Sequence, residues 1–306
     1  MSRFKPKKRK RKAGRGIRYL LLGALLCAAV LAVLIKLDII SPSLILKRPA
    51  AADAGTTVRF IDVGQGDCTL AVSEGKALLI DSGETDERDR VIAYIKSLGL
   101  KRLECIVVTH PHSDHMGEMA DIIDSLEVGR IIMPEIPREK ITAGYSYDRL
   151  LKAADRKNVP VEAAESGSFT VGELEVGLFV PLAQTDDLND CSVITKLTHG
   201  SNSFLIMADC GSAEEKELLQ SGFDLKSDVL RVGHHGSSSS SSEQFLEAVR
   251  PAYAVISCGA GNDYGHPSEK ALKRLKAFAR ETYITRDSGT VTFVSDGGGI
   301  TVICEK

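Results

Sequence analysis

The sequence predicts a mixed α/β (α+β) protein in which two β-sheets pack face to face and helices cover both outer faces. The chain of 306 residues is 43% hydrophobic and 26% charged, which suits one sizeable globular domain, or at most two. After residue 57 it alternates short apolar segments with amphipathic ones. The second half repeats the rhythm of the first half, with paired strands followed by alternating helices and strands. Each half therefore supplies one layer of sheet and one of helix, in the order αββα.

The first half of the domain begins with three closely spaced strands. Gly and acidic residues separate these apolar runs, which is typical of antiparallel strands joined by tight turns. A segment with helical spacing and a Gly stop follows, and strands and helices then alternate. The strands are expected at residues 58–64, 68–72, 76–83, 105–110 and 130–135, and the helices at residues 89–100, 116–125 and 147–157.

The second half begins with paired strands over residues 168–181 and a hairpin over residues 191–209. A run of serines at residues 237–242 is interpreted as a loop with a serine N-cap, and a cluster of hydroxyl groups facing a substrate is the alternative. A helix is expected at residues 213–221 and leads to the segment DVLRVGHHG at residues 228–236. Strands are expected at residues 253–259 and 282–287, each preceded by a helix, and a last pair of strands at residues 290–297 and 300–305.

The N-terminal part of the chain has the pattern of a membrane anchor. Residues 1–18 carry many Lys and Arg residues and no acidic residue, whereas residues 19–35 carry no charge. With the next few residues, this apolar segment reaches the roughly 20 residues that span a bilayer. A cleaved signal peptide is the rival interpretation, although no small-x-small cleavage site closes the segment. We expect a basic cytoplasmic tail at residues 1–18, a transmembrane helix at 19–40, a linker at 41–57 and an extracytoplasmic domain at 58–306.

Charge and composition narrow the class of protein. The net charge of −2 provides no overall basic field for nucleic acid, and the lack of Trp argues against an aromatic platform for single strands. The seven cysteines have no spacing typical of zinc sites or disulfide frameworks, so we interpret them as small buried hydrophobes. Cys210 is singled out because it follows Asp209, and a thiol near a metal can ligate or oxidise.

The segment VVTHPHSDHMG, at residues 107–117, contains three of the seven histidines of the chain and one aspartate within six residues. His110, His112, Asp114 and His115 directly follow an apolar strand. Neutral imidazole and carboxylate suit Zn, Mn and Fe. Four such ligands exceed what one tetrahedral ion accepts while it keeps a position for substrate, so we infer two adjacent ions. A His-rich surface turn is the alternative.

The motif THPHSDH resembles the HxHxDH signature of the metallo-β-lactamase fold superfamily. Further motifs resemble, in order, the extracellular hydrolase-like domain of the ComEC competence protein family. They are FIDVGQGD, LLIDSG, VVTHPHSDHMG, DVLRVGHHGS, VISCGAGNDYGHP and TRDSGTVTF, and they run from about residue 58 to the C-terminus. The resemblance implies a four-layer αββα metallo-β-lactamase sandwich. A full ComEC protein also carries a multi-helix membrane channel, whereas this chain has one predicted span, so DNA uptake does not transfer with the motifs.

The resemblance also implies where two divalent ions, Zn or Mn, would bind. The first ion of the family matches His110 and His112, and the second matches Asp114 and His115. Asp209, at the end of the segment SFLIMAD, matches the aspartate that bridges both ions. The residue before this aspartate is usually glycine in the family, and here it is alanine.

The remaining ligand positions follow the superfamily less closely. One of His234 and His235 matches the last histidine, and the sequence leaves both as candidates. The third motif of the superfamily supplies a histidine, but Asn189 stands near that place, as it tends to in the ComEC branch, which weakens the case for a filled first site. His199 is an alternative ligand, which we expect to be a surface turn residue instead. Asp81 matches an aspartate that orients the site.

Three further residues are expected to act on the substrate or beside the metals. His266, in YGHP, would donate a proton to the leaving group or bind phosphate, and a structural loop histidine is the alternative. Asp67, in the tight turn GQGD, would support the metal ligands, and Ser237 would bind a phosphate oxygen. Asp114 and Asp209 would hold the metals and accept hydrogen bonds from the attacking water, whose pKa two ions lower from about 15.7 toward neutrality.

These features predict a membrane-anchored extracytoplasmic hydrolase that cleaves a phosphodiester. Nuclease activity is what the resemblance implies, so DNA is one expected substrate. The lack of an obvious Lys/Arg stripe weakens the case for a long polymer and makes a nucleotide or a choline- or glycerol-phosphate of the cell envelope a rival. Hydrolysis of a β-lactam or another acyl compound is a further alternative. So is a non-catalytic role beside a separate DNA-uptake channel protein. The sequence leaves the oligomeric state open.

Overall fold

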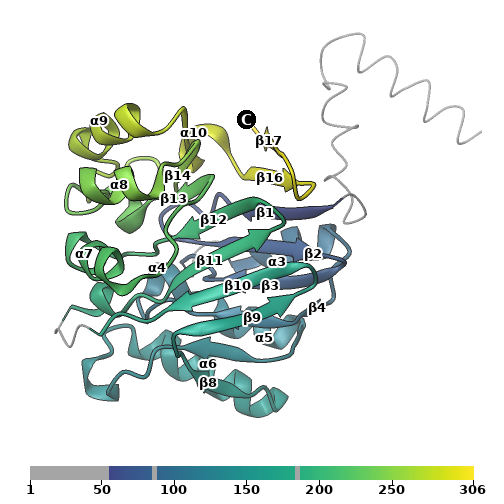
Figure 1. Ribbon diagram of the computed structural model, residues 1–306. Helices are drawn as coiled ribbons and strands as arrows, with labels where there is room; N and C mark the ends of the chain where they lie inside the picture. The colour runs from purple at the N-terminus through teal and green to yellow at the C-terminus, as the bar shows by residue number, and fades with distance from the viewer. Residues whose placement is uncertain (1–54, 85–87, 183–186) are drawn as a thin grey trace, which may run out of the picture. The chain divides into compact units, whose positions relative to one another are not determined.

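The computed structural model describes residues 55–84, 88–182 and 187–306, which form two β-sheets packed against each other between helices (Figure 1). The predicted tail, the predicted span at 19–40 and most of the predicted linker lie outside the described residues. In the part of the chain that the structure describes, no helix is both long and apolar enough to cross a membrane. The first strand begins at Thr56, just before the predicted domain boundary at residue 58.

The first sheet has eight strands among the described residues, in the order β17-β16-β1-β2-β3-β5-β7-β8. Strands β1, β2 and β3 pair antiparallel, as predicted, and β3, β5, β7 and β8 pair in parallel. The strands are β1 Thr56–Phe60, β2 Thr69–Ser73, β3 Lys76–Ile80, β5 Cys105–Val107, β7 Ile131–Met133, β8 Val161–Ala163, β16 Val291–Ser295 and β17 Ile300–Cys304; β4 Arg102–Leu103 and β6 Glu127–Val128 form a separate small pair.

The second sheet has seven strands within the same described ranges, in the order β15-β14-β13-β12-β11-β10-β9. Strands β9 to β12 pair antiparallel, which confirms the predicted paired strands and hairpin. Strands β12 to β15 pair in parallel. The strands are β9 Gly167–Val171, β10 Leu174–Phe179, β11 Ile194–His199, β12 Asn202–Ile206, β13 Val229–Arg231, β14 Tyr253–Ile256 and β15 Glu281–Ile284.

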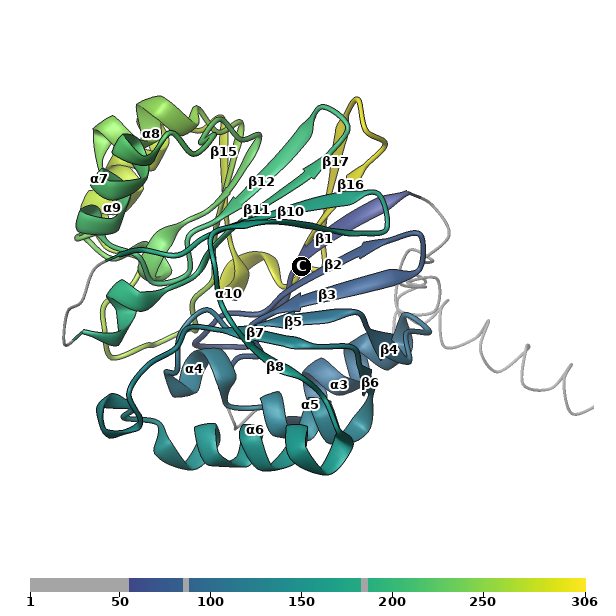
Figure 2. The same ribbon diagram turned by 60° about the horizontal axis from the view of Figure 1, so that its bottom comes forward.

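Helices cover the outer face of each sheet, as Figure 2 shows. Three apolar clusters hold the layers together. One cluster lies between the two sheets, and one lies between each sheet and its helices, which confirms the αββα order. On the first sheet lie α3 Arg88–Ser97, α5 Met119–Ser125 and α6 Gly144–Lys157, and on the second α7 Ser212–Ser221, α8 Glu243–Val249 and α9 Glu269–Phe278.

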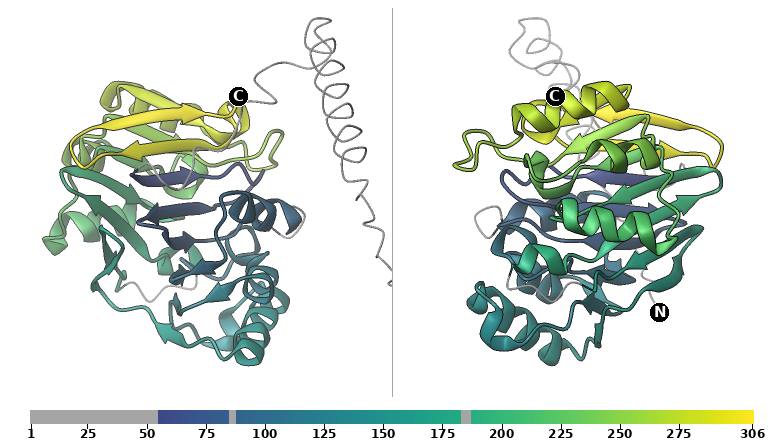
Figure 3. Two further views of the ribbon diagram at one scale, coloured as in Figure 1. Left: turned by 90° about the vertical axis from the view of Figure 1, so that its right-hand side faces the viewer. Right: turned by 60° about the vertical axis from the view of Figure 1, so that its left-hand side comes forward.

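The C-terminal hairpin β16–β17 joins the first sheet, although its neighbours in the chain belong to the second. Strand β16 pairs antiparallel with β1, and the left view of Figure 3 shows the hairpin beside the N-terminal strands. The ring of Phe293, on β16, lies 5.8 Å from the ring of Phe60 and 6.0 Å from that of Phe204. Phe204 belongs to β12, so this aromatic cluster ties the hairpin to both sheets.

The structure corrects two predicted elements. The helix expected at residues 116–125 is interrupted at its start: α4 Ser113–Met116 ends at Met116, the N–H of Gly117 donates to the carbonyl of Gly83 at 3.0 Å, and α5 begins only at Met119. The strand expected at residues 282–287 ends at Ile284, and the short helix α10 Thr285–Ser288 follows. Both changes occur just after the end of a parallel strand, β5 in the first sheet and β15 in the second.

The expectation that His199 is a surface turn residue is wrong. His199 is the last residue of β11, and only 8% of it is exposed. Its Nδ1 lies 2.7 Å from Ser295 Oγ, and its Nε2 lies 3.3 Å from Glu173 Oε2. The hairpin tip is covered because the β16–β17 turn lies against it, with Ser201 N–H donating to Gly297 O at 2.7 Å.

We predict that Phe293→Ala lowers the free energy of unfolding by about 3–5 kcal/mol, because it leaves a cavity between the two sheets. Urea unfolding followed by circular dichroism measures this change. The control is Ile303→Ala on the neighbouring strand β17, where the residue is 47% exposed and we expect a change within about 0.5 kcal/mol. Equal changes in the two variants would contradict the anchoring role of Phe293.

Candidate metal centre

The predicted site residues gather where the parallel strands of both sheets end. Asp81 follows β3, and the HPHSDH segment follows β5 of the first sheet. Asp209 follows β12, and His234 and His235 follow β13 of the second sheet. Neighbouring parallel strands end at the same edge of a sheet, and the two sheets lie face to face. Side chains from distant parts of the sequence therefore meet at one point.

The HPHSDH segment changes from extended chain to helix within six residues. His112 is extended, with φ −90° and ψ 155°, and α4 makes a single turn after it. The turn GQGD lies against this helix: the N–H of Asp67 donates to Asp114 O at 3.0 Å, and a Cβ on Gly66 would overlap that carbonyl. The GQGD turn thereby holds Asp114 and His115 in place.

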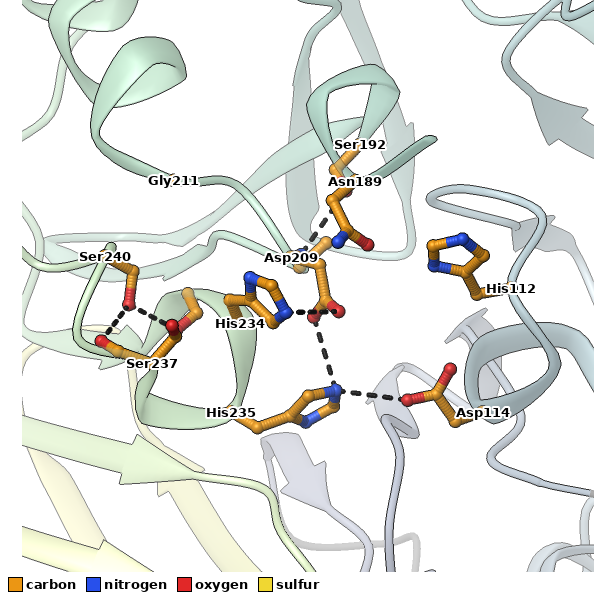
Figure 4. A network of polar contacts seen from close by, with 12 residues as sticks. His112, Asp114, Asn189, Ser192, Asp209, Gly211, His234, His235, Ser237 and Ser240 are labelled. Carbon is orange, nitrogen blue, oxygen red and sulfur yellow. Dashed lines mark hydrogen bonds and ion pairs between the residues drawn. The ribbon is translucent and has the colours of Figure 1, made fainter. Parts of the chain in front are cut away.

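Asp114, His115, Asp209 and His235 form one cluster, in which one ligand atom of each lies within 4.8 Å of the others. His115 Nε2 lies 3.3 Å from Asp209 Oδ1. His235 Nε2 lies 3.4 Å from the same oxygen and 3.3 Å from Asp114 Oδ2, as Figure 4 shows. Both Nε2 atoms and Asp209 Oδ1 are buried without a hydrogen-bond partner among the described residues. Since buried polar atoms are normally paired, this set of donors fits a divalent ion.

Hydrogen bonds to the far sides of the two rings turn their Nε2 atoms toward the cluster. His115 Nδ1 lies 2.7 Å from Asp81 Oδ2, and Asp81 accepts two hydrogen bonds from Thr109, at 2.8 and 2.7 Å. His235 Nδ1 lies 2.8 Å from the carbonyl of Ser257, to which it donates. Such contacts select the tautomer that leaves Nε2 for a metal.

His110 and His112 present a second pair of ligand atoms. His110 Nε2 lies 3.0 Å from His112 Nδ1, and Ser192 Oγ lies 3.2 Å from His110 Nδ1. Asn189, in the 3-10 turn η3 Leu188–Cys191, has a buried Oδ1 without a hydrogen-bond partner in the described ranges. Figure 4 shows Asn189 between His112 and His234. Within the described residues the two histidines belong to no group of three close ligand atoms, so this first site is less complete than the cluster.

The adjacent histidines of the 3-10 turn η4 Gly233–Gly236 point to different places. Both have left-handed backbone, with φ 48° for His234 and 51° for His235, which costs non-glycine residues about 1–2 kcal/mol each. The turn sends His235 into the cluster and leaves His234 at its rim. The side chain of His234 is 29% exposed, and its Nε2 lies 3.9 Å from Asp209 Oδ2.

Burial and mutual attraction set the charges in the cluster. Burial alone would raise the pKa of Asp209, but His235 and His115 hold it well below its usual range. Burial alone would lower the pKa of His235, but Asp209 and Asp114 raise it to about 10. Asp209 and Asp81 likewise raise the pKa of His115 well above its usual value, against the effect of burial. Without metal, the cluster therefore pairs ionised carboxylates with protonated imidazoles.

A cavity of about 360 Å³ opens beside the cluster. It is lined by Asp114, Asp209 and His235 of the cluster, together with Gln65, Asn189, Tyr264 and His266 among others. The ring of His266 stacks on that of Tyr264, with centroids 6.0 Å apart, and lies 5.6 Å from the ring of His234. Burial, and then His234, lower the pKa of His266, so its imidazole is neutral near pH 7.

The structure does not bring Ser237 to the cavity, and it buries Cys210 in the protein. Ser237 Oγ lies 2.9 Å from Ser239 Oγ, and Ser237 is not among the residues that line the cavity. Ser242, in the same run, accepts a hydrogen bond from Phe245 N–H at the start of α8, which confirms the loop with a serine N-cap. Cys210 is fully buried, and burial raises the pKa of its thiol well above the usual value.

Arg231 is a residue beside the cluster that the sequence analysis did not single out. It lies at the end of β13, is fully buried, and forms an ion pair with Asp67. A signal was present in the sequence, because Arg231 interrupts the apolar strand DVLRVG. Arginine is almost never fully buried unless it is paired, so a charge in this strand predicts a buried partner.

The fold belongs to a known class of protein. Residues 61–260 match the metallo-beta-lactamase superfamily, and the chain belongs to this superfamily. It is similar to ComE operon protein 3 of Bacillus subtilis (strain 168), with 28% identity over 256 residues that cover 77% of this chain and 32% of that protein. It is also similar to the Competence protein ComA of Neisseria gonorrhoeae, with 28% identity over 264 residues that cover 83% of this chain and 34% of that protein.

The chain spans about a third of the length of these curated relatives. A solved structure, that of the metallo-beta-lactamase fold protein YhfI from Bacillus subtilis, superposes with a TM-score of 0.53 at 12% identity. This likeness covers 81% of this chain and 100% of that protein, and it shows the fold.

We predict that one divalent ion bound by the cluster releases about two protons at pH 7, because His115 and His235 are protonated before metal binds. Calorimetric titration with Zn²⁺ in buffers of different ionisation enthalpy measures this number. Since metal competes with these protons, the apparent affinity rises from pH 7 toward pH 10. Binding without proton release would contradict the charge assignment.

Proposed function

We propose that this chain is a metal-dependent phosphodiesterase that works with two divalent ions, Zn or Mn. In this proposal Asp114, His115, Asp209 and His235 hold one ion. His110 and His112 hold the other, with Asp209 between the two. The observation that carries the proposal is the set of buried ligand atoms without hydrogen-bond partners, among the described residues, beside an open cavity.

Two divalent ions at such a centre supply a water nucleophile near neutral pH and neutralise charge on phosphoryl oxygens. Asp114 and Asp209 are ionised, because the histidines of the cluster outweigh burial and lower the pKa of both. They can therefore accept hydrogen bonds from a water in the cavity. His266 is neutral on the cavity wall, and its Nδ1 is buried without a partner among the described residues. We propose that His266 donates a hydrogen bond to an oxygen of the substrate.

Apart from the two proposed ions, the charged side chains around the cavity favour a diester over a monoester. No Lys or Arg is among the described residues that line it, whereas two carboxylates, Asp114 and Asp209, are. A phosphomonoester carries about −1.5 to −2 charge near pH 7, because its second pKa is about 6, and a diester has no second ionisation. Tyr264, 71% exposed at the rim, offers an aromatic face to a base or another flat group.

We propose further that residues 19–40 anchor the chain in a membrane with the hydrolase domain outside the cytoplasm. The basic segment before the apolar one supports this orientation. Similarity to a protein named for competence supports DNA as substrate and a separate channel protein as partner. The described residues that line the cavity include no Lys or Arg, which a long DNA strand would need. A nucleotide or a small phosphoester of the cell envelope is therefore the alternative substrate.

We predict that the purified chain with Zn²⁺ or Mn²⁺ hydrolyses bis-p-nitrophenyl phosphate at least about 10-fold faster than p-nitrophenyl phosphate, because the described residues that line the cavity include no Lys or Arg that could join the ions in neutralising the second charge. Single-stranded DNA and a β-lactam complete the panel, and p-nitrophenol absorbance, gel electrophoresis and loss of β-lactam absorbance measure turnover. Asp114→Ala should lower turnover by about 10–100-fold or more. A chain that binds no metal and cleaves no diester would contradict the proposal. Equal activity in Asp114→Ala would point to a contaminant.

We predict that Asn189→His tightens binding of the first ion by about 10-fold or more, because imidazole replaces a neutral amide beside His112. Metal content after dialysis against a weak chelator, measured by mass spectrometry of the elements, should rise toward two ions per chain. Asn189→Ser is the control and should not gain metal. If Asn189→His and Asn189→Ser retain the same amount, Asn189 does not face the first site.

A further inference from the structure

Arg231 connects three segments of the candidate metal centre although it is fully buried. Its guanidinium pairs with Asp67 and donates to the carbonyl of Ala208. One of its nitrogens lies 3.3 Å from His235 Nδ1, and another lies 4.0 Å from Asp209 Oδ1. The side chain therefore lies directly behind the ligand atoms of the cluster.

Asp67 belongs to the half of the centre that the first sheet supplies. Its N–H donates to Asp114 O at 3.0 Å, and its carbonyl accepts a hydrogen bond from Gly83 N–H at 2.7 Å. Its Oδ2 lies 3.9 Å from His115 Nδ1. A shift of Asp67 would thus move the backbone that carries Asp114.

Ala208 belongs to the half that the second sheet supplies. It directly precedes Asp209, and its φ of 47° is left-handed, a conformation that favours glycine. Its carbonyl accepts hydrogen bonds from both Arg231 and the N–H of His234, at 2.8 Å for the latter. Arg231 therefore holds an alanine in a strained conformation and, through it, fixes the direction of Asp209.

We propose that the buried Arg231–Asp67 ion pair is a positioning device that sets the distance between the two half-sites, so that their ligands are arranged before metal arrives. The inference rests on the proposed metal centre. A buried ion pair is weak evidence for stability, because apolar residues of similar volume often stabilise a protein as well or better. What apolar residues do not supply is a directional link from Asp114 to Asp209 across the two sheets.

A double-mutant cycle with Co²⁺ as the probe metal tests this role. Arg231→Met leaves the buried carboxylate of Asp67 without its cation, and Asp67→Asn leaves the buried guanidinium of Arg231 without its anion. Each single variant should therefore unfold at a lower urea concentration than the wild type in the presence of chelator. The double variant should regain most of that stability. We nevertheless expect it to bind Co²⁺ at least about 10-fold more weakly, with a changed visible absorption spectrum, because the half-sites are no longer aligned.

The matched control is the partly buried pair Arg149–Asp121, whose charged atoms lie 2.7 Å apart away from the cluster. Removing this pair by Arg149→Met and Asp121→Asn should leave the affinity for Co²⁺ unchanged. If the Arg231→Met/Asp67→Asn variant regains both wild-type stability and wild-type affinity, the pair is only structural and the proposal is overturned.

Arg231→Lys keeps the test decisive if the double variant does not fold. Lysine preserves the charge but not the fork that reaches both Asp67 and Ala208. It should fold and bind Co²⁺ more weakly, and wild-type affinity in this variant would also overturn the proposal. Failure of the proposed function is seen separately: a wild type that binds Co²⁺ but cleaves no ester leaves the positioning role intact, whereas a wild type that binds no metal removes the centre itself.

Discussion

The burial of several carboxylates at one point is the constraint on which the rest of this structure depends. Asp67, Asp81 and Asp209 are each no more than 5% exposed, and Asp114 lies beside them. Carboxylates buried together repel one another and take up protons unless opposite charges and hydrogen bonds stabilise the ionised form. Arg231 faces Asp67, and the imidazoles of the cluster face the rest. The ligand atoms that have no hydrogen-bond partner among the described residues are those that a divalent cation fits.

The fold meets this constraint because it brings two sets of strand ends together. The first sheet supplies His110, His112, Asp114 and His115 on one segment, and the second supplies Asp209 and His235 on two others. Neither half has a complete set of ligands. The face-to-face packing of the sheets, with the apolar cluster between them, therefore builds the centre as well as the core.

Local backbone strain concentrates at the same edge. Among the described residues, eight non-glycine residues have positive φ, and four of them are Asp81, Ala208, His234 and His235. Each conformation costs roughly 1–3 kcal/mol and persists only where surrounding contacts enforce it. Thr109 and His115 fix Asp81, and Arg231 fixes Ala208. The left-handed conformation at these positions therefore directs nearby side chains toward the metal centre, whereas an unstrained turn would direct them elsewhere.

The sequence by itself determined most elements, the αββα layers and the HPHSDH segment as a group of ligands. These follow from local patterns: apolar periodicity, glycine turns and the spacing of a few ligand residues along one segment. The role of Asp81 and the pairing of Asp209 with the first-sheet ligands came from a family resemblance, which carries information that periodicity lacks. The choice between His234 and His235 stayed open, because they are adjacent and only the left-handed turn gives their rings different directions.

Tertiary structure decided what depends on contacts between segments far apart in the chain. It placed the C-terminal hairpin on the first sheet, because β16 pairs with β1 and Phe293 packs against Phe60 and Phe204. The same hairpin buried His199, which its own neighbours in the sequence present as a turn residue. Tertiary packing also paired Arg231 with Asp67, although the two residues are 164 positions apart in the chain (231 − 67). In addition, it placed Ser237 against Ser239 rather than at the cavity. Local patterns specify which way a residue faces on its own element, but its partner is chosen only when the two sheets pack.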